Sequence, residues 1–415
     1  MKRIESNSQK DWVKNAIALK YPLVNKIVFY IMVLSTTLIG FFKGVLPESS
    51  GKDAQWYPAK LLSENIDFYN FYLLNFEDWF MRSVPNYYFQ LYYLLQPAGS
   101  MPWETFKLVW FFTNVAMLLL FLFLIKKDFE LGYREMNIVF LPFFIGFPLI
   151  NLFTNGQSTL LILLLIYLVW KYRDNRVLLP ILLSFLTIKY SFAIPILFGF
   201  LLMGYYRSVI WSGLITLIFP LIYSLQFGLD FISTVFLPFN VSTSVTANPI
   251  GSGPADLMSL YGQLSDAPLI GVNILTITLA IFVAFFAFVC IKYQLDKKTV
   301  FLGSILFSLF GFFHFGHDYI IFLLLIPFAI KMRHFKLFYV YALVFCFMPR
   351  IIRLLDMILQ TNIGVKEFMR SELYVIFNVI VLISCFVHLI RTDVKFKKTS
   401  MAALTKTGKC NPQSG

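Results

Sequence analysis

The sequence predicts an all-α polytopic membrane protein, a bundle of about 10–12 transmembrane helices with amphipathic helices in its first outer loop. Of its 415 residues, 58% are hydrophobic and only 14% are charged, whereas soluble domains carry about 25% charged residues. Apolar runs recur from residue 25 to residue 390, as many membrane crossings require. Basic residues gather in alternate connecting segments, which is the pattern of the positive-inside rule.

The apolar runs are the predicted spans. A full helical crossing needs about 20 residues, and several runs are shorter, so we expect some to be merged, tilted or partly re-entrant. The first run follows a mostly polar segment and lacks an A-x-A site behind it, so we interpret it as a retained span rather than a signal peptide. The predicted spans are residues 25–44, 105–125, 138–154, 157–171, 177–188, 190–204, 208–226, 272–292, 299–313, 318–331, 335–349 and 372–390.

The charge distribution predicts the orientation of these spans. The inner segments, with the basic residues at span edges, hold 25 of the 35 Lys and Arg and 8 of the 22 Asp and Glu. The inner side is thus near +17 (25 minus 8) and the outer side near −4 (10 minus 14), which predicts both termini in the cytoplasm. We attribute the net charge of +13 to this topology and to anionic lipid, and expect a multi-pass protein of the cell's inner (plasma) membrane. The inner segments are 1–24, 126–137, 172–176, 205–207, 293–298, 332–334 and 391–415.

The predicted organisation is a single transmembrane domain, residues 25–390, between a cytoplasmic N-terminal segment, 1–24, and a disordered cytoplasmic tail, 391–415. The four cysteines have no zinc or redox spacing, so we expect no disulfide framework and no metal site. No cofactor is expected. The larger outer segments are 45–104, 227–271 and 350–371.

The first outer segment interleaves many aromatic residues with a few acids, Asp67, Glu77 and Asp78. This composition suits short helices at the level of the lipid headgroups. A carboxylate that is partly desolvated there becomes a stronger base, as general-base catalysis requires. The alternative is an aromatic belt with solvated acids.

Lys189 lies inside an apolar stretch, and our topology places it at the outer end of a hairpin of two short spans. A charge within the hydrocarbon costs roughly 3 kcal/mol or more, so such a lysine faces a polar cavity or reaches an interface. The functional interpretation is a cation for a phosphate group. The alternative is a lysine at a turn that extends to the interface.

Two further polar groups lie at outer turns. His314, His317 and Asp318 form a weak metal signal, and suit hydrogen bonding or proton transfer or the capping of two helices. Asn155 and Gln157 flank a glycine in a turn, and the alternative for them is a plain turn without a functional role. Because all four features fall on one side of the predicted topology, the sequence favours a site on the outer, periplasmic or extracellular, face.

At these motifs the chain resembles the bacterial polyprenyl-phosphate-mannose-dependent mannosyltransferases, glycosyltransferase family 87 of the GT-C superclass. Residues 67–72 are similar to the family's Asp-Phe-x-x-Tyr-Tyr, with Phe71 where the first Tyr usually stands. Residues 186–189 are similar to its Leu-Lys-Pro, with Tyr190 where Pro is usual. The resemblance extends in order over roughly residues 60–330, through the segment from Pro85 to Asn114, Asn155-Gly156-Gln157 and His317-Asp318-Tyr319.

The resemblance implies transfer of a hexose, mannose in the family, from a polyprenyl-phosphate donor to a lipid or glycan acceptor by a single inverting displacement. It assigns the general base to Asp67. We expect Lys189 and His317 at the donor phosphate, with Arg350 and Arg353 in reserve. A monophosphate donor is expected to need no metal. The expected partners are this donor, the acceptor and membrane lipids, and not nucleic acid. The remaining candidates for substrate binding are Tyr69, Tyr72, Glu77, Asp78, Asn155, Gln157 and His314.

Three other functions are weighed against this one. A secondary transporter or lipid or glycan flippase typically shows internal repeats and polar groups near the bilayer midplane, and the sequence has no obvious repeat. A glycan polymerase or ligase would carry an Arg-rich outer loop, but the first outer segment holds only Lys52, Lys60 and Arg82 before the second span. A non-catalytic scaffold would tolerate loss of the Asp67 carboxylate.

Overall fold

In the computed structural model, all of the described secondary structure is helical. The described residues are 22–47, 51, 55–75, 84–144, 146–246, 274–312, 314, 316–331, 338–343, 346–347, 351, 354, 358 and 372–407. The helices are α2 (Pro22–Gly44), α3 (Trp56–Ser63), α4 (Phe68–Leu74), α5 (Phe89–Gly99), α6 (Trp103–Asp128), α7 (Tyr133–Phe144), α8 (Phe147–Asn155), α9 (Thr159–Lys171), α10 (Leu178–Leu186), η1 (Thr187–Lys189), α11 (Tyr190–Leu202), α12 (Tyr206–Phe227), α13 (Phe231–Thr246), α15 (Ile274–Tyr293), α16 (Lys297–Gly311), η2 (Gly316–Ile321), α17 (Phe322–Lys331) and α20 (Glu372–Thr407).

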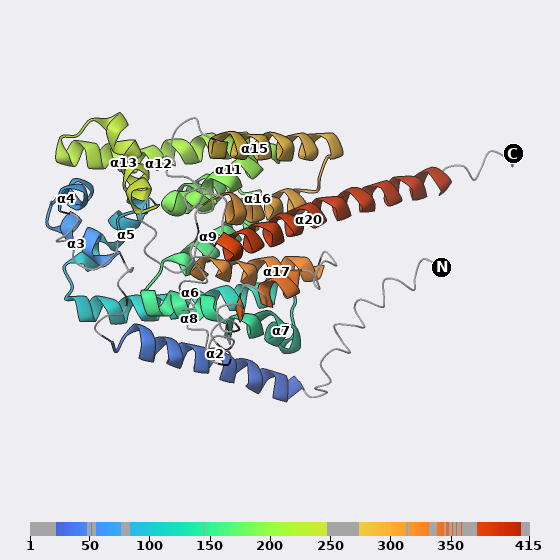
Figure 1. Cartoon of the computed structure of the whole chain (residues 1–415), viewed down its shortest axis with the longest axis horizontal. Coiled ribbons are helices and arrows are strands. Elements are labelled where there is room, and N and C mark those ends of the chain that lie inside the picture. The colour runs from blue at the N-terminus through green and yellow to red at the C-terminus, as the bar shows by residue number, and fades with distance from the viewer. Residues whose placement is uncertain are drawn as a thin grey trace, which may run out of the picture.

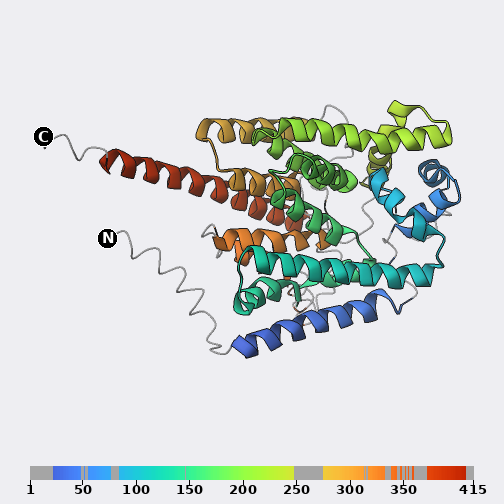
Figure 2. The same cartoon turned by 180° about the vertical axis from the view of Figure 1, so that it is seen from behind.

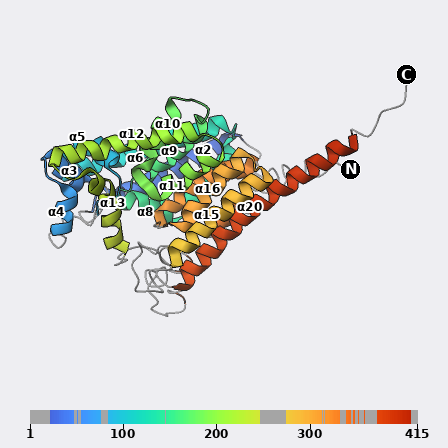
Figure 3. The ribbon, with the colours of Figure 1, turned by 90° about the horizontal axis from the view of Figure 1, so that it is seen from above.

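The helices form one bundle whose two ends differ. The long helices α2, α6 and α12 run along the bundle, and the short helices α3, α4 and α5 cover one of its ends (Figures 1 and 2). At the opposite end, the last part of α20 projects beyond the other helices (Figures 1 and 3). We call these the α5 end and the α20 end.

Long apolar helices identify the chain as a membrane protein. By length and composition, four described segments could cross a membrane: α2, α6, the run from Leu178 to Leu202, and α12; α7 with α8 would make a fifth. The bundle also exposes large apolar side chains, such as Leu23 (67%), Phe123 (61%) and Trp211 (60%). Such surfaces suit lipid rather than water.

The apolar core lies around α16. Every residue of α16 from Thr299 to Gly311 is buried, which makes it a central helix of the bundle. α11 and α20 pack along it, as Ser308 Oγ donating to the Ser191 carbonyl (2.7 Å) and the contact of the Phe310 and Phe386 rings show. A helix that is apolar on all sides needs this central position.

The run from Leu178 to Leu202 has the length of a crossing, but it is not one straight helix, because it reverses direction at Lys189. At the α20 end, the Tyr205 hydroxyl donates to Asp174 (2.7 Å), which brings the chain just after Leu202 back beside the chain just before Leu178. At the α5 end, the Tyr88 N–H donates to the Ile188 carbonyl (3.0 Å). α10 and α11 therefore form a hairpin whose turn includes Lys189, as the sequence predicts.

The span count stays a prediction, and the prediction for the tail changes. Twelve spans are predicted; four described segments, or five if α7 and α8 are taken together, pass a test of length and composition for a crossing. α9 and α16 have 13 and 15 residues, or about 20 and 22 Å, less than the roughly 30 Å of hydrocarbon. The tail from residue 391 is predicted to be disordered, whereas α20 continues as a helix to Thr407.

Candidate functional site

Asp67 caps the N-terminus of α4 at the α5 end. Its Oδ1 accepts the Asn70 backbone N–H (3.1 Å), and its Oδ2 accepts the Asn70 side-chain amide (2.6 Å). An aspartate at this position satisfies backbone donors that the first helical turn leaves open. A third donor comes from α12, because the Tyr223 hydroxyl donates to Oδ1 at 2.6 Å. The carboxylate is thus fixed by two elements far apart in the sequence.

Aromatic packing holds Tyr223 against this carboxylate. The Tyr223 ring lies 4.9 Å from the Phe89 ring, 5.3 Å from the Phe68 ring and 5.8 Å from the Tyr69 ring, centroid to centroid. Tyr69 and Tyr72 are buried with the two phenylalanines, so they form part of the packed core beneath Asp67 and are not exposed to a substrate. Burial raises the pKa of Tyr69 well above its usual range, and its neutral hydroxyl donates to the Tyr87 carbonyl at 2.8 Å.

Lys189 and Asp318 form a buried ion pair at the hairpin turn. Lys189 Nζ lies 2.5 Å from Asp318 Oδ1, and the side chains are 13% and 0% exposed. The Thr159 hydroxyl donates to the same oxygen (2.9 Å), and His314 Nδ1 lies 3.2 Å from the other. A buried carboxylate needs such partners, because leaving it unpaired is strongly unfavourable. We call Lys189, Asp318, His314, Thr159 and Ser308 the Lys189 cluster.

His314 joins this cluster to α16 and α11. Its Nε2 lies 3.1 Å from both the hydroxyl and the carbonyl oxygen of Ser308. The imidazole ring packs on Phe192, with 4.3 Å between centroids. Among the described residues, no group of three or more His, Cys, Asp or Glu side chains could hold a metal ion.

Tyr87 connects Asp67 to the Lys189 cluster. Its carbonyl accepts the Tyr69 hydroxyl, two residues after Asp67. Its ring centroid lies 5.9 Å from Lys189 Nζ, within reach of a cation–π contact. Its own hydroxyl donates to Gln157 Oε1 at 2.9 Å. Asp67 and Lys189 therefore lie at the same end of the bundle, with buried tyrosines between them.

The turn after α8 contributes one of its two predicted residues. Gly156 has a positive φ of 71° at the end of α8, a conformation that glycine adopts without strain. Its carbonyl accepts the Trp110 indole N–H at 2.7 Å. Gln157 is buried and reaches Tyr87, whereas the Asn155 amide donates to Asn151 of its own helix (3.0 Å).

The remaining predicted residues fall outside the described part of the site. His317 belongs to η2, but its side chain is not among those described. Glu77, Asp78, Arg350 and Arg353 lie outside the described residues.

The sequence analysis did not identify the partners of Asp67 and Lys189. Tyr223 gives no signal, since it is one tyrosine within an apolar span. Asp318 could have been paired with Lys189 in advance, because each is an ionisable residue beside an apolar run and each needs an opposite charge. A cavity of about 320 Å³ is lined by residues at the other end of the bundle, such as Asp128 and Lys171, and belongs to neither group.

Comparisons with protein-family models, with curated proteins and with solved structures find no match to this chain.

Proposed function

We propose that this chain is a membrane-embedded hexosyltransferase that moves a sugar, mannose in the family it resembles, from a polyprenyl-phosphate donor to a lipid or glycan hydroxyl. The observation that supports this best is that a fixed carboxylate, Asp67, and a partly accessible cation, Lys189, occupy the same end of the bundle. A base and an anion-binding group are the two functions that such a transfer needs.

Asp67 has the free capacity that a general base needs. A carboxylate offers about four lone-pair sites, and the described donors use two at Oδ1 and one at Oδ2. The remaining site at Oδ2 accepts the proton of the acceptor hydroxyl as its oxygen bonds to the anomeric carbon. The bond from that carbon to the phosphate oxygen breaks in the same step, and the lipid phosphate leaves with the electron pair. One displacement of this kind inverts the anomeric carbon.

Lys189 supplies positive charge for the departing phosphate. An ammonium group carries three N–H donors, and the described contacts use one, on Asp318. The other two are available to phosphate oxygens. In this proposal His317, Arg350 and Arg353 reinforce the phosphate site, and no metal ion takes part.

The orientation of the bundle supports an outer-face site in the plasma membrane. Basic residues gather at the α20 end, including Lys127, Lys171, Arg173, Lys297 and Lys298. The positive-inside rule places such an end in the cytoplasm, and the α5 end then faces the periplasm or the exterior.

The test uses membranes from cells that express the full chain, incubated with labelled polyprenyl-phosphate-mannose. Wild-type membranes should release lipid phosphate and label a lipid or glycan product. Asp67→Asn should reduce the rate at least 100-fold, whereas Glu64→Gln, which removes an exposed carboxylate three residues away, should not. Equal rates for Asp67→Asn and wild type would overturn the proposal.

A secondary transporter or lipid or glycan flippase is the second candidate, and one observation favours it. The Lys189 cluster places a lysine, an aspartate and a histidine inside a helical bundle, an arrangement that ion-coupled transporters use. The purified protein in proteoliposomes decides between the two: a transporter moves the lipid-linked sugar across the bilayer without cleaving the phosphate–sugar bond.

A further inference from the structure

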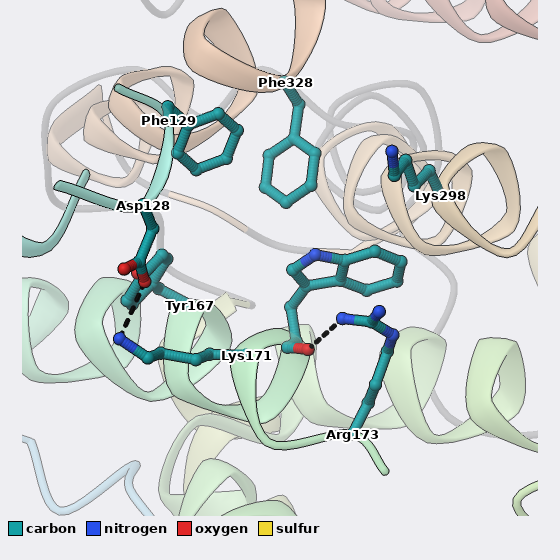
Figure 4. Close-up of a pocket in the computed structure, with 8 residues that line it drawn as sticks. Asp128, Phe129, Tyr167, Lys171, Arg173, Lys298 and Phe328 are labelled. Carbon is teal, nitrogen blue, oxygen red and sulfur yellow. Dashed lines mark hydrogen bonds and ion pairs between the residues drawn. The ribbon is translucent and has the colours of Figure 1, made fainter. Parts of the chain in front are cut away.

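A cavity of about 320 Å³ opens at the α20 end, far along the bundle from the Lys189 cluster. It lies between the last residues of α6 and α9, the first turn of α16, and α17. Figure 4 shows Asp128 and Lys171 on one side of the cavity and Arg173 and Lys298 on the other. The lining residues are Asp128, Phe129, Tyr167, Trp170, Lys171, Arg173, Lys298 and Phe328.

The charges around this cavity do not cancel. Asp128 is the one acidic residue among the described residues that line the cavity, and it pairs with Lys171 (2.7 Å) and accepts a hydrogen bond from the Tyr167 hydroxyl. The cations Arg173 and Lys298 remain. The cavity therefore presents two positive charges beyond the internal ion pair.

Arg173 is held in a fixed position at the rim. Its guanidinium carbon lies 4.3 Å from the centroid of the Trp170 ring, and one terminal nitrogen donates to the Trp170 carbonyl (2.9 Å). Its Nε lies 3.6 Å from Asp174, which is 71% exposed, so that ion pair is weak. Arginine carries five N–H donors, and the described contacts leave several of them for a ligand.

Lys298 is the second cation at the cavity. Among the described residues, its ammonium group has no hydrogen bond or ion pair, and it lies in the first turn of α16. The backbone N–H groups of a first helical turn add partial positive charge next to it. Phe129, Phe328 and Trp170 supply apolar surface between these polar groups.

We propose that this cavity binds the phosphate group of an anionic ligand, with Arg173 and Lys298 as the recognising residues. Bidentate donors of arginine and the compact charge of lysine suit phosphate oxygens. The volume is at the lower end for small-molecule sites, so it admits a phosphorylated headgroup but not a whole lipid. The phosphate belongs to an anionic lipid or to a soluble phosphorylated compound. Basic pockets between transmembrane helices are used in this way for lipid headgroups.

This proposal does not depend on the transferase, because the two sites share no residue. The test titrates the purified full chain in detergent and follows its melting temperature, which rises with ligand as binding saturates. The probes are dihexanoyl phosphatidic acid, dihexanoyl phosphatidylcholine and inorganic phosphate. Wild type should bind phosphatidic acid saturably and phosphatidylcholine not at all, and binding should weaken at high salt.

Variants connect the binding to this cavity. Lys298→Gln and Arg173→Gln should each weaken phosphatidic acid binding by about three- to tenfold. Lys127→Gln removes an exposed charge at the same end that does not line the cavity, and should leave the affinity unchanged. Lys298→Arg should retain it. Because Lys298 has no described structural contact, its loss tests binding without unfolding the protein.

The outcomes separate the sources of the phosphate. Binding of phosphatidic acid alone supports a lipid headgroup, and equal binding of inorganic phosphate supports a soluble ligand. The proposal is overturned if no phosphate probe binds saturably, or if Lys298→Gln and Arg173→Gln both bind as wild type does.

Discussion

The ion pair between Lys189 and Asp318 gives the sharpest test of the site. Lys189→Met keeps a long apolar side chain but removes the charge, and so leaves the fully buried Asp318 carboxylate without its cation. Breaking one partner of a buried pair costs about 3–5 kcal/mol. Thr159 and His314 still contact Asp318 in this variant. We therefore expect a loss of unfolding free energy near ~3 rather than ~5 kcal/mol.

The reciprocal change should cost less. Asp318→Asn keeps an acceptor oxygen in place, and the Lys189 side chain is 13% exposed, so its ammonium group can move toward water. The double variant, with neither charge, should be more stable than Lys189→Met alone, since no unpaired charge remains. Reversible unfolding in mixed micelles measures all four proteins. Strictly additive losses in the double variant would refute the pairing.

The same variants report on the proposed phosphate role. Asp318 competes with any anion for the Lys189 ammonium group, so Asp318→Asn should lower the KM for the polyprenyl-phosphate donor. Lys189→Met should raise it. If Lys189 is a structural residue alone, both variants lower stability and neither shifts KM at a temperature where the protein is folded.

Three further variants test the support of Asp67 and the packing of the helices. Tyr223→Phe removes the hydroxyl that donates to Asp67 but keeps the ring packing. We expect the free energy of unfolding to fall by about 0.5–1.5 kcal/mol, which a melting experiment measures. We also expect a clear fall in transfer rate, measured by product labelling. Gly44→Ala places a Cβ 2.2 Å from the Phe153 carbonyl oxygen, so α2 and α8 must separate, at a cost of about 1–3 kcal/mol. Gly213→Ala, in α12, is the control: its Cβ meets nothing within 4 Å, so the change should be neutral or stabilising by up to about 1 kcal/mol. A similar loss of stability in both glycine variants would contradict the close contact between α2 and α8.

The positions of the helices were largely readable from the sequence. The predicted span over 208–226 is observed as Tyr206–Phe227, and 105–125 as Trp103–Asp128. These agreements follow from the length of each apolar run, which is a local property. The sequence also predicts the turn at Lys189, because a charge inside an apolar stretch marks a place where the chain reaches a polar region.

The number of crossings and the contacts of the site were not readable in the same way. Whether a short apolar helix such as α9 or α16 crosses fully or stops partway depends on its neighbours, and hydropathy cannot report that. Asp67 meets Tyr223 across 156 positions of sequence, and Lys189 meets Asp318 across 129. Such pairs are decided by packing, and the sequence shows only that each ionisable residue needs some partner.

The charges of the Lys189 cluster are buried and paired at the α5 end, but Lys298 is exposed at the α20 end, and this difference follows from the lengths of the helices. α9 ends and α16 begins at the α20 end. Because both helices are short, they stop before α5 at the other end of the bundle, and the Lys189 cluster is buried there. At that depth a charge is stable only with a partner, and Lys189 and Asp318 provide one for each other. At the α20 end the helix termini reach solvent, where a cation such as Lys298 needs no partner. A buried, positioned pair suits bond-breaking chemistry, in which fixed dipoles act on developing charge, whereas an excess of cations around an open cavity suits the capture of an anion. The structure thus separates the features expected for transfer from those expected for binding, and places them at opposite ends of the bundle.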